Sequence, residues 1–256
     1  MQNFKISKSG VKVFVDYRDN VTIDKDNPVL KKKAGYPREI YTKGNVKGLS
    51  RFGSENSEDI KSWNLFRSLQ FKNEINKYYE AIEIKDNLND ILFWGLNVDN
   101  GVFDKVLKDV LDEIEPPNLW TIQQTEPDVI ILGEQTVIFN ESKLGRSGGP
   151  IDAWNRKDPF SKKHELYKRN ALPYFKKGFI DNFETQARRY YQLMRNYIVG
   201  SCYAKRIGKE FHLTVLVSSK NIARSGLTHK EEFATFCSFL LDSSNCHFLT
   251  WDQFGL

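Results

Sequence analysis

The stretch from Glu126 to Gly145 constrains the fold of this chain more than any other. Four apolar residues, Val129 to Leu132, precede Gly133-Glu134-Gln135, and three more apolar residues, Val137 to Phe139, follow. Two apolar runs separated by a short glycine-containing segment are typical of a β-hairpin. We therefore expect a pair of antiparallel strands here, joined by a tight turn.

The register of this hairpin determines which polar residues meet. Residues equally far from so short a turn lie opposite each other. Pairing Leu132 with Thr136 places Asp128 beside Asn140 and Glu141. The carboxylate that opens the hairpin and the one that closes it are therefore predicted at the same end.

Lys143 adds a cation to these carboxylates. Glu141 and Lys143 are two residues apart, so their side chains leave the strand on one face. Hard oxygen ligands suit Mg²⁺, which keeps waters and accepts a phosphate oxygen. A bound metal lowers the pKa of water and neutralises charge that builds on phosphorus. A nearby lysine can orient that water or stabilise the transition state.

Pro127-Asp128, twelve intervening residues and Glu141-Ser142-Lys143 together resemble the motif of the PD-(D/E)XK superfamily. This is the restriction-endonuclease-like fold, which includes repair nucleases and resolvases. The resemblance spans residues 51 to 252, although only the hairpin motif is specific, and Asn140 stands where an apolar residue is expected. The alternative interpretation is a surface hairpin with ordinary polar ends.

The resemblance implies a set of roles for these residues. Asp128 and Glu141 would ligate one or two Mg²⁺ ions, with Mn²⁺ as a substitute. The backbone carbonyl of Ser142 would add a ligand, and Lys143 would position or activate the attacking water. The expected reaction is the hydrolysis of a phosphodiester bond, with DNA as the expected nucleic-acid partner.

A helix is predicted before the hairpin, and it supplies one more candidate acid. Ser57 is a plausible N-cap, and Glu58 and Asp59 follow in the first turn, where acids favour the helix dipole. An apolar stripe then recurs at helical spacing, formed by Ile60, Trp63, Phe66 and Leu69. The resemblance implies that Glu58 joins the metal site and the catalytic set. The alternative is that Glu58 and Asp59 serve only as helix-start residues.

A second helix is predicted over residues 181 to 198, with an apolar stripe and basic residues, Arg195 among them, on its flanks. Gln186 and Tyr190 stand four apart on one face. This pair is similar to the Gln-xxx-Tyr signature of one branch of the superfamily, so Gln186 is a candidate catalytic residue. Gln192 is the competing glutamine.

The remaining segments complete an α/β pattern. We expect a short buried segment at 91–96, a helix with Val102, Val106, Val110 and Ile114 inward, a strand at 211–219, a helix beginning in a capping box at Thr228, and a last strand at 247–251. We expect a mobile loop from Gly145 to Pro150, in which Arg146 is well placed to meet substrate; the alternative is that Arg146 is merely exposed. This order predicts a three-layer α/β/α sandwich with a central mixed β-sheet and helices on both faces.

The N-terminal region has a different character. Residues 1–50 contain a predicted strand around Val13 and then a charged stretch, with Lys31-Lys32-Lys33 and Arg38, that predicts a solvated loop. The functional alternative is a basic arm that reaches phosphates. We assign residues 1–50 to an N-terminal strand and basic loop extension, and 51–256 to a nuclease-like α/β domain.

Composition bounds the functional classes. The 256 residues are 40% hydrophobic and 28% charged, which is typical of a globular chain, and the net charge of +5 permits binding to a polyanion. Three cysteines without metal spacing predict reduced thiols in a cytoplasmic protein. No signal peptide or membrane-spanning run is evident, so no membrane partner is expected.

Two rival classes stay open. One is a nuclease-fold domain that binds nucleic acid or protein without cleavage, and the other is a structural or interaction α/β protein. Symmetric cleavage of both DNA strands would favour a two-fold homodimer as the oligomeric state.

Overall fold

A computed structural model describes residues 3–116, 126–144, 160–219 and 226–255, with the side chains of α5 described from Glu165 onward. The chain divides into two compact units. Unit 1 comprises residues 1–85 and 96–102, and unit 2 comprises residues 86–95 and 103–256. Residues 51–85, which the sequence groups with the later domain, lie in unit 1.

Unit 1 combines short strands with short and long helices. Its strands are β1 (Phe4–Ile6) and β2 (Lys12–Phe14), which form a two-stranded antiparallel sheet, and β4 (Leu96–Asn97). Its helices are η1 (Tyr17–Asn20), α1 (Pro28–Ala34), η2 (Pro37–Glu39), η3 (Arg51–Gly53), α2 (Glu58–Phe71) and α3 (Asn76–Ala81).

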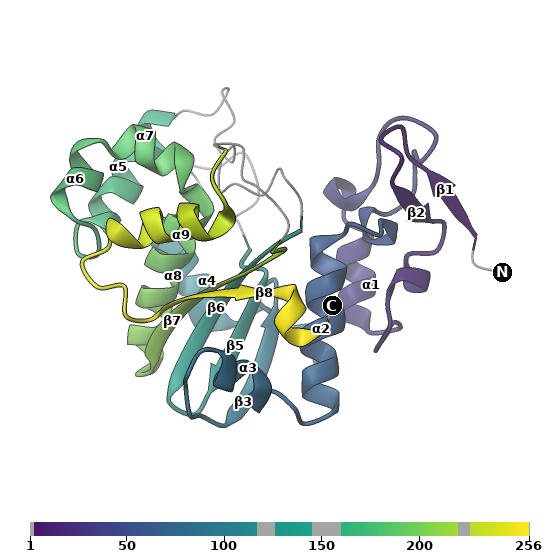
Figure 1. Ribbon diagram of the computed structural model, residues 1–256, viewed down its shortest axis with the longest axis horizontal. Helices are drawn as coiled ribbons and strands as arrows, with labels where there is room; N and C mark the ends of the chain where they lie inside the picture. Colours follow the sequence, from purple (N-terminus) through teal and green to yellow (C-terminus); the bar gives the residue numbers. More distant parts are fainter. Residues whose placement is uncertain (1–2, 117–125, 145–159, 220–225, 256) are drawn as a thin grey trace. The chain divides into compact units, whose positions relative to one another are not determined.

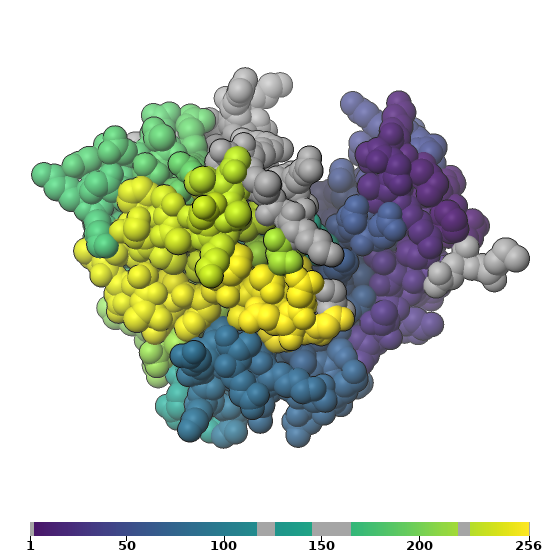
Figure 2. Space-filling model, viewed as in Figure 1, coloured from purple at the N-terminus to yellow at the C-terminus, as the bar shows by residue number. Residues whose placement is uncertain are grey.

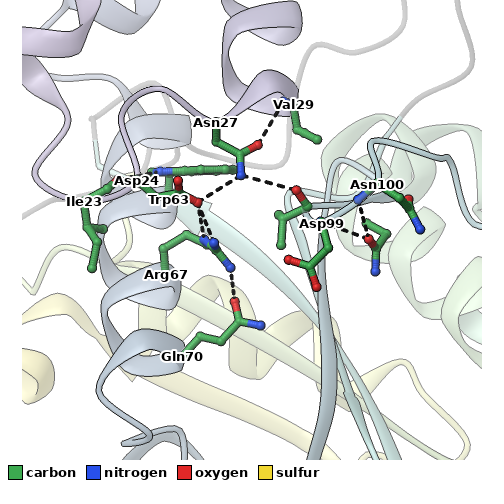
Figure 3. Close-up of polar contacts among 11 residues, drawn as sticks. Ile23, Asp24, Asn27, Val29, Trp63, Arg67, Gln70, Asp99 and Asn100 are labelled. Carbon is green, nitrogen blue, oxygen red and sulfur yellow. Dashed lines mark hydrogen bonds and ion pairs between the residues drawn. The ribbon is translucent and has the colours of Figure 1, made fainter.

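The predicted helix after Ser57 is confirmed as α2. The Ser57 side chain accepts a hydrogen bond from the backbone N–H of Ile60, as an N-cap should. The four residues of the predicted stripe are all buried. Figure 3 shows how this helix is fixed within unit 1: Arg67 donates to Asp24, and Trp63 Nε1 donates to the carbonyl of Ile23 at 3.0 Å.

The loop predicted around Lys31-Lys32-Lys33 is wrong, because these residues lie in α1. Asn27 caps this helix by accepting from Val29 N–H, and Pro28 at the first helical position has its preferred geometry. Val29 and Leu30 are buried beneath the helix. Two apolar residues and a good cap therefore outweigh the charge of the lysine run.

Unit 2 is built on a mixed sheet. Within unit 2, the strands of this sheet lie in the order β3-β5-β6-β7-β8 (Figure 1). The strands of unit 2 are β3 (Leu88–Phe93), β5 (Val129–Gly133), β6 (Thr136–Lys143), β7 (Glu210–Val217) and β8 (Cys246–Thr250). β3, β5 and β6 pair antiparallel, whereas β6, β7 and β8 pair parallel. The return of the chain from the predicted hairpin to a parallel strand is confirmed.

Helices α4 to α9 of unit 2 share a core on one face of this sheet. The helices of unit 2 are α4 (Lys105–Ile114), α5 (Phe160–Ala171), α6 (Lys177–Asp181), α7 (Phe183–Arg189), α8 (Tyr191–Ile207), α9 (His229–Ser238) and the 3-10 helix η5 (Trp251–Phe254). α8 packs across β6 and β7, and α4 packs against α8 (Figure 1). Val137 and Phe139 of β6 enter this core, whereas Ile138 belongs to the opposite face.

The single helix predicted over 181–198 is wrong in detail. α7 ends at Arg189, and α8 begins at Tyr191 after Tyr190 adopts φ −120° and ψ 29°. Tyr190 is fully buried, and its ring packs near Phe236 and Phe239. The break between α7 and α8 therefore coincides with the packing of the Tyr190 ring against Phe236 of α9 and Phe239, the residue that follows α9.

Other boundaries follow the sequence closely. The capping box at Thr228 and Glu231 is confirmed, and Phe233, Phe236 and Leu240 are buried as predicted. α4 begins later than predicted: Asp104 caps it, and Val102 lies before it and is 61% exposed. Arg146 and the predicted loop from Gly145 to Pro150 lie outside the described residues. Among the helices that are described, none combines the length and the apolar character needed to cross a membrane.

Candidate active site

The predicted hairpin is present as β5 and β6, but its register differs by one residue from the predicted register. Leu132 pairs with Val137 and Val129 pairs with Asn140, so the turn contains only Glu134 and Gln135. The predicted pairing of Leu132 with Thr136 is therefore wrong. Continued by one residue, the observed register places Asp128 opposite Glu141, so the two acidic residues still lie at the same end of the hairpin.

Asp86 explains the shorter turn. Its carboxylate accepts hydrogen bonds from the backbone N–H groups of Glu134, Gln135 and Thr136. A Cβ atom at Gly133 would lie 2.0 Å from Asp86 Oδ2, so the absence of a side chain at Gly133 leaves room for this carboxylate. Burial acts to raise the pKa of Asp86, but the hydrogen bonds from Thr136, Asn87 and Gln135 hold it below the ordinary value.

Asp128 is fixed at the entrance of β5 by the neighbouring strand. Its Oδ2 accepts a hydrogen bond from the backbone N–H of Ser142 at 2.9 Å. Its own carbonyl accepts from the N–H of Trp94 at 3.2 Å. The side chain of Asp128 is half-buried, so the carboxylate is held by the main chain at the same strand end as Glu141.

Glu141 and Lys143 form a close ion pair on one face of β6. Lys143 Nζ lies 2.6 Å from Glu141 Oε1, and the two side chains are 13% and 3% exposed. The prediction that they share a face is therefore confirmed. Val137 and Phe139 precede them on this face and enter the helix-side core, so the pair lies where the sheet meets α8.

α8 supplies the second layer of contacts to Glu141. Asn196 Nδ2 donates to Glu141 Oε2 at 2.7 Å, and Arg195 Nη2 donates to Asn196 Oδ1 at 2.9 Å. Both residues are almost fully buried. The sequence placed Arg195 on the flank of an amphipathic helix, and that placement is wrong because α8 is covered on this side too.

These contacts decide the ionisation of Glu141. Burial acts to raise the pKa of its carboxyl, but the positive charges of Lys143 and Arg195 and the hydrogen bond from Asn196 outweigh it. The pKa of Glu141 therefore lies below its ordinary value, and the group is a carboxylate at neutral pH. Burial acts to lower the pKa of Arg195, which Tyr191 and Glu141 raise instead.

A further acidic residue, Glu115, acts on the positive charge of Arg195. Glu115 is fully buried after the end of α4, and the hydroxyl of Tyr167 donates to it. Tyr191 packs edge-on against Tyr167, with ring centroids 5.7 Å apart. The buried charges at this point of the core thus alternate in sign, as the low-polarity surroundings require.

A pocket opens beside the ion pair. It has about 380 Å³ of empty space, part of it open to solvent. Its lining includes the following residues: Glu141, Lys143, Gln192, Leu193, Val215, Val217, His229, Glu232 and Phe233. The charged groups of the site therefore border a small space that is partly open to solvent.

α9 adds two polar groups that sequence reasoning missed. His229 and Glu232 are buried side chains of its first turn, and both face the pocket. Arg189 holds Glu232 through two hydrogen bonds of 2.7 and 3.2 Å. A capping box at Thr228 signalled the helix start, but nothing in the sequence indicated that this helix end would line the same pocket as Glu141 and Lys143 of β6.

The two candidate glutamines are separated by the break at Tyr190. Gln192 lies in the first turn of α8 and lines the pocket. Gln186 lies on α7, where its carbonyl accepts from the N–H of Tyr190 at 2.8 Å, and it is not among the described residues that line the pocket. The geometry favours Gln192 as the residue of the site, and a catalytic part for Gln186 stays a prediction.

Ser142 and Asn140 face away from Glu141. Asn140 Nδ2 donates to Ser142 Oγ at 2.8 Å, and Thr214 Oγ1 donates to Asn140 Oδ1 at 3.1 Å. The asparagine at this apolar position is therefore satisfied by its neighbours on the sheet. A ligand role for the carbonyl of Ser142 stays a prediction.

Glu58 belongs to unit 1, at the first position of α2. Asp128 and Glu141 belong to unit 2. The part of Glu58 in the metal site therefore also stays a prediction.

The donor set is compatible with a divalent cation. Mg²⁺ is bound by one or two carboxylates together with waters and a phosphate oxygen, and Asp128 and Glu141 supply two carboxylates. Glu141 Oε1 is buried and lies within ion-pair distance of Lys143, but it accepts no hydrogen bond of regular geometry. No cluster of three or more His, Cys, Asp or Glu side chains suited to a metal occurs among the described residues.

Comparison with other proteins adds no assignment. No protein-family model matches the chain, and neither curated protein sequences nor solved structures gave a significant match.

Proposed function

We propose that this protein is a metal-dependent nuclease of the PD-(D/E)XK class that hydrolyses phosphodiester bonds in DNA. The single observation that carries the proposal is the Glu141–Lys143 ion pair on β6, bordering a pocket, with Asp128 opposite it across the hairpin. Two acids and a lysine with this spacing on a hairpin are the part of the sequence that resembles the superfamily.

The arrangement of unit 2 supports the same proposal. The motif hairpin is followed by helices α5 to α8 and then by β7, which pairs parallel to β6. This connection places α8 against β6, the strand that carries Glu141 and Lys143. A restriction-endonuclease-like, three-layer α/β/α sandwich is part of the proposal, and the mixed sheet with its helix layer is the feature that supports it.

The residues of the site have separate roles. Asp128 and Glu141 would hold Mg²⁺ or Mn²⁺, together with the carbonyl of Ser142 and with Glu58 from unit 1. When bound, the metal lowers the pKa of a water and neutralises charge on the phosphate. Lys143 orients the attacking water and stabilises the negative charge that develops on phosphorus.

The buried neighbours keep Glu141 ready for this role. Asn196 fixes the orientation of its carboxylate, and Arg195 keeps it ionised. Hydrogen bonds behind a ligand raise the precision with which the ligand is held. His229 and Glu232 complete the wall on the α9 side, where Arg189 balances the charge of Glu232.

The experiment that tests the proposal is a cleavage assay with purified protein. Supercoiled plasmid and single-stranded DNA are incubated with Mg²⁺, with Mn²⁺ and with EDTA. We expect cutting with either metal and none with EDTA. Cutting that persists in EDTA would contradict the metal mechanism. Tight metal-independent binding without any cutting would identify a binding domain instead.

A further inference from the structure

The excess positive charge of this protein belongs entirely to unit 1. Unit 1 carries 17 Lys and Arg against 12 Asp and Glu, whereas unit 2 carries 21 of each, so the net charge of +5 arises in unit 1. The candidate active site lies in unit 2. The candidate active site therefore does not account for the net positive charge of unit 1.

Within unit 1 the charge is concentrated in one segment. Residues 31–51 contain seven basic residues and a single acid, Glu39. Six of the basic side chains are exposed, and one of them, Arg38, is paired with Glu39. We call the other five the basic face: Lys31, Lys32, Lys43, Lys47 and Arg51. Within the described residues, no ion pair with an acid involves any of these five side chains.

The segment is a folded surface, and its shape is fixed by main-chain contacts. Tyr41 exchanges hydrogen bonds with the far side of its loop, since its N–H donates to the carbonyl of Leu49 and its carbonyl accepts from Gly48. Ser50 Oγ donates to the carbonyl of Ala34 at 3.0 Å, which ties the loop to the end of α1. The backbone that carries the basic face is thus ordered before any partner binds, which lowers the entropy cost of binding.

Aromatic rings lie between the charges. The guanidinium of Arg51 lies over the ring of Tyr41, 5.0 Å from its centroid, and Arg51 Nε donates to the carbonyl of Arg38 at 3.1 Å. Arg38 lies over the ring of Tyr36, 6.0 Å from its centroid. Such stacking holds the guanidinium groups in place without neutralising them.

We propose that the basic face of unit 1 binds the phosphate backbone of nucleic acid. Exposed lysines and arginines that no acid neutralises can pair with phosphates of DNA, and this pairing releases counterions. A membrane surface fits less well, because membrane-binding helices present large apolar side chains beside their basic ones. None of the large apolar side chains that are exposed in the described chain lies between residues 31 and 51.

This inference rests on the proposed function in one respect only, since it names a surface for the DNA that the nuclease is proposed to cut. Binding to the basic face itself requires no metal and no cutting. In Figure 2, the residues of unit 1 from 3 to about 50 are coloured purple to dark blue.

The test measures DNA binding in EDTA, so that cleavage cannot interfere. Binding of the full-length protein to a short labelled DNA duplex is followed by fluorescence anisotropy at a series of salt concentrations. The double variant Lys43→Gln/Lys47→Gln is compared with Lys177→Gln/Lys205→Gln, which removes two exposed lysines from unit 2. Both variants lose the same charge, and circular dichroism checks that both fold.

We expect only the unit 1 variant to change the salt dependence. The slope of log K against log salt should fall by about 0.9 for each lost phosphate contact, or about 1.8 for the pair. Equal slopes for the two variants would overturn the inference, as would preferential binding of the wild type to vesicles of anionic lipid. Salt-dependent binding through Lys43 and Lys47, together with no cutting in the separate cleavage assay with Mg²⁺ or Mn²⁺, would instead refute the proposed nuclease and leave the inference standing.

Discussion

Glu141 is a buried carboxylate whose three neighbours all favour its charged form. Lys143 lies 2.6 Å from one oxygen, Asn196 donates to the other, and Arg195 adds a second positive charge behind Asn196. Taking these charges out of water is costly, and the cost is offset only while each has its partner. We therefore expect Glu141 to contribute to the stability of the fold in addition to its proposed part in the reaction.

The first prediction concerns the pH dependence of stability. The folded pKa of Glu141 lies below its ordinary value of 4.5, so its charge stabilises the fold above that pH and the contribution is lost as the pH falls below it. Glu141→Gln should lower the free energy of unfolding by about 3 kcal/mol at neutral pH. Urea unfolding of both proteins should show this difference shrinking in acid. A difference that stays constant with pH would contradict the account.

The second prediction concerns Asn196. Removing a side chain that orients a metal ligand typically costs about 10- to 100-fold in metal affinity or activity. Asn196→Ala should raise the Mg²⁺ concentration needed for half-maximal cleavage by about that factor. Asn182→Ala, at an exposed asparagine of unit 2, is the control. If both variants need the same Mg²⁺ concentration as the wild type, Asn196 has no part in positioning the site.

The contacts of Glu141 show how far the sequence could predict the site. The positions of Asp128, Glu141 and Lys143 in the sequence were enough to predict that the two acids lie at one end of the hairpin and that Glu141 and Lys143 share a face. This is because a strand alternates its side chains with a fixed period of two. Asn196, His229 and Glu232 could not be found in this way. Their helices reach β6 only through tertiary packing, and a buried arginine such as Arg195 looks like a helix flank when its surroundings are unknown.

At the scale of elements, the hairpin shows where local patterns fail. The strands were predictable from their apolar runs, but their register depended on Asp86, which lies 48 residues before Glu134 in the chain. The loop predicted at Lys31-Lys32-Lys33 failed for a similar reason, since its helix is held by a cap and by two buried apolar residues. Short elements are decided by such single contacts, whereas the long stripe of α2 was unambiguous.

The third prediction tests the turn of the hairpin. Asp86→Ala removes one carboxylate that accepts hydrogen bonds from three backbone N–H groups. Hydrogen bonds to charged groups contribute about 1.5–3 kcal/mol each, and water replaces part of this at a half-buried turn. The variant should unfold at lower urea, with a loss of about 2 kcal/mol. Asp109→Ala, at an exposed residue of α4, should change stability far less, and equal effects would disprove the role of Asp86.

At the scale of the whole molecule, the net positive charge and the candidate site belong to different units of the chain. Unit 1 holds the net positive charge, and unit 2 holds the acids and the lysine of the candidate site. If unit 1 binds a polyanion and unit 2 cleaves it, as proposed, cleavage needs both units. Glu58 of unit 1 is a further residue whose proposed role can be tested.

The fourth prediction compares two neighbouring acids of unit 1. Glu58 and Asp59 both lie in the first turn of α2, where either acid stabilises the helix by about 0.3–1 kcal/mol. Glu58→Gln and Asp59→Asn should therefore cost similar stability in thermal unfolding. Only Glu58→Gln should slow metal-dependent cleavage. Equal cleavage rates for the two variants would restrict Glu58 to the role of a helix-start residue.

The most direct measurement is the initial rate of Mg²⁺-dependent DNA cleavage by folded Asp128→Ala and Lys143→Ala proteins. Asp109→Ala and Lys105→Ala, at exposed positions of α4, are the matched controls. Loss of a group that stabilises the transition state costs about 100-fold or more, so both site variants should fall at least that far while the controls keep the wild-type rate. Wild-type cleavage by either site variant would contradict the account.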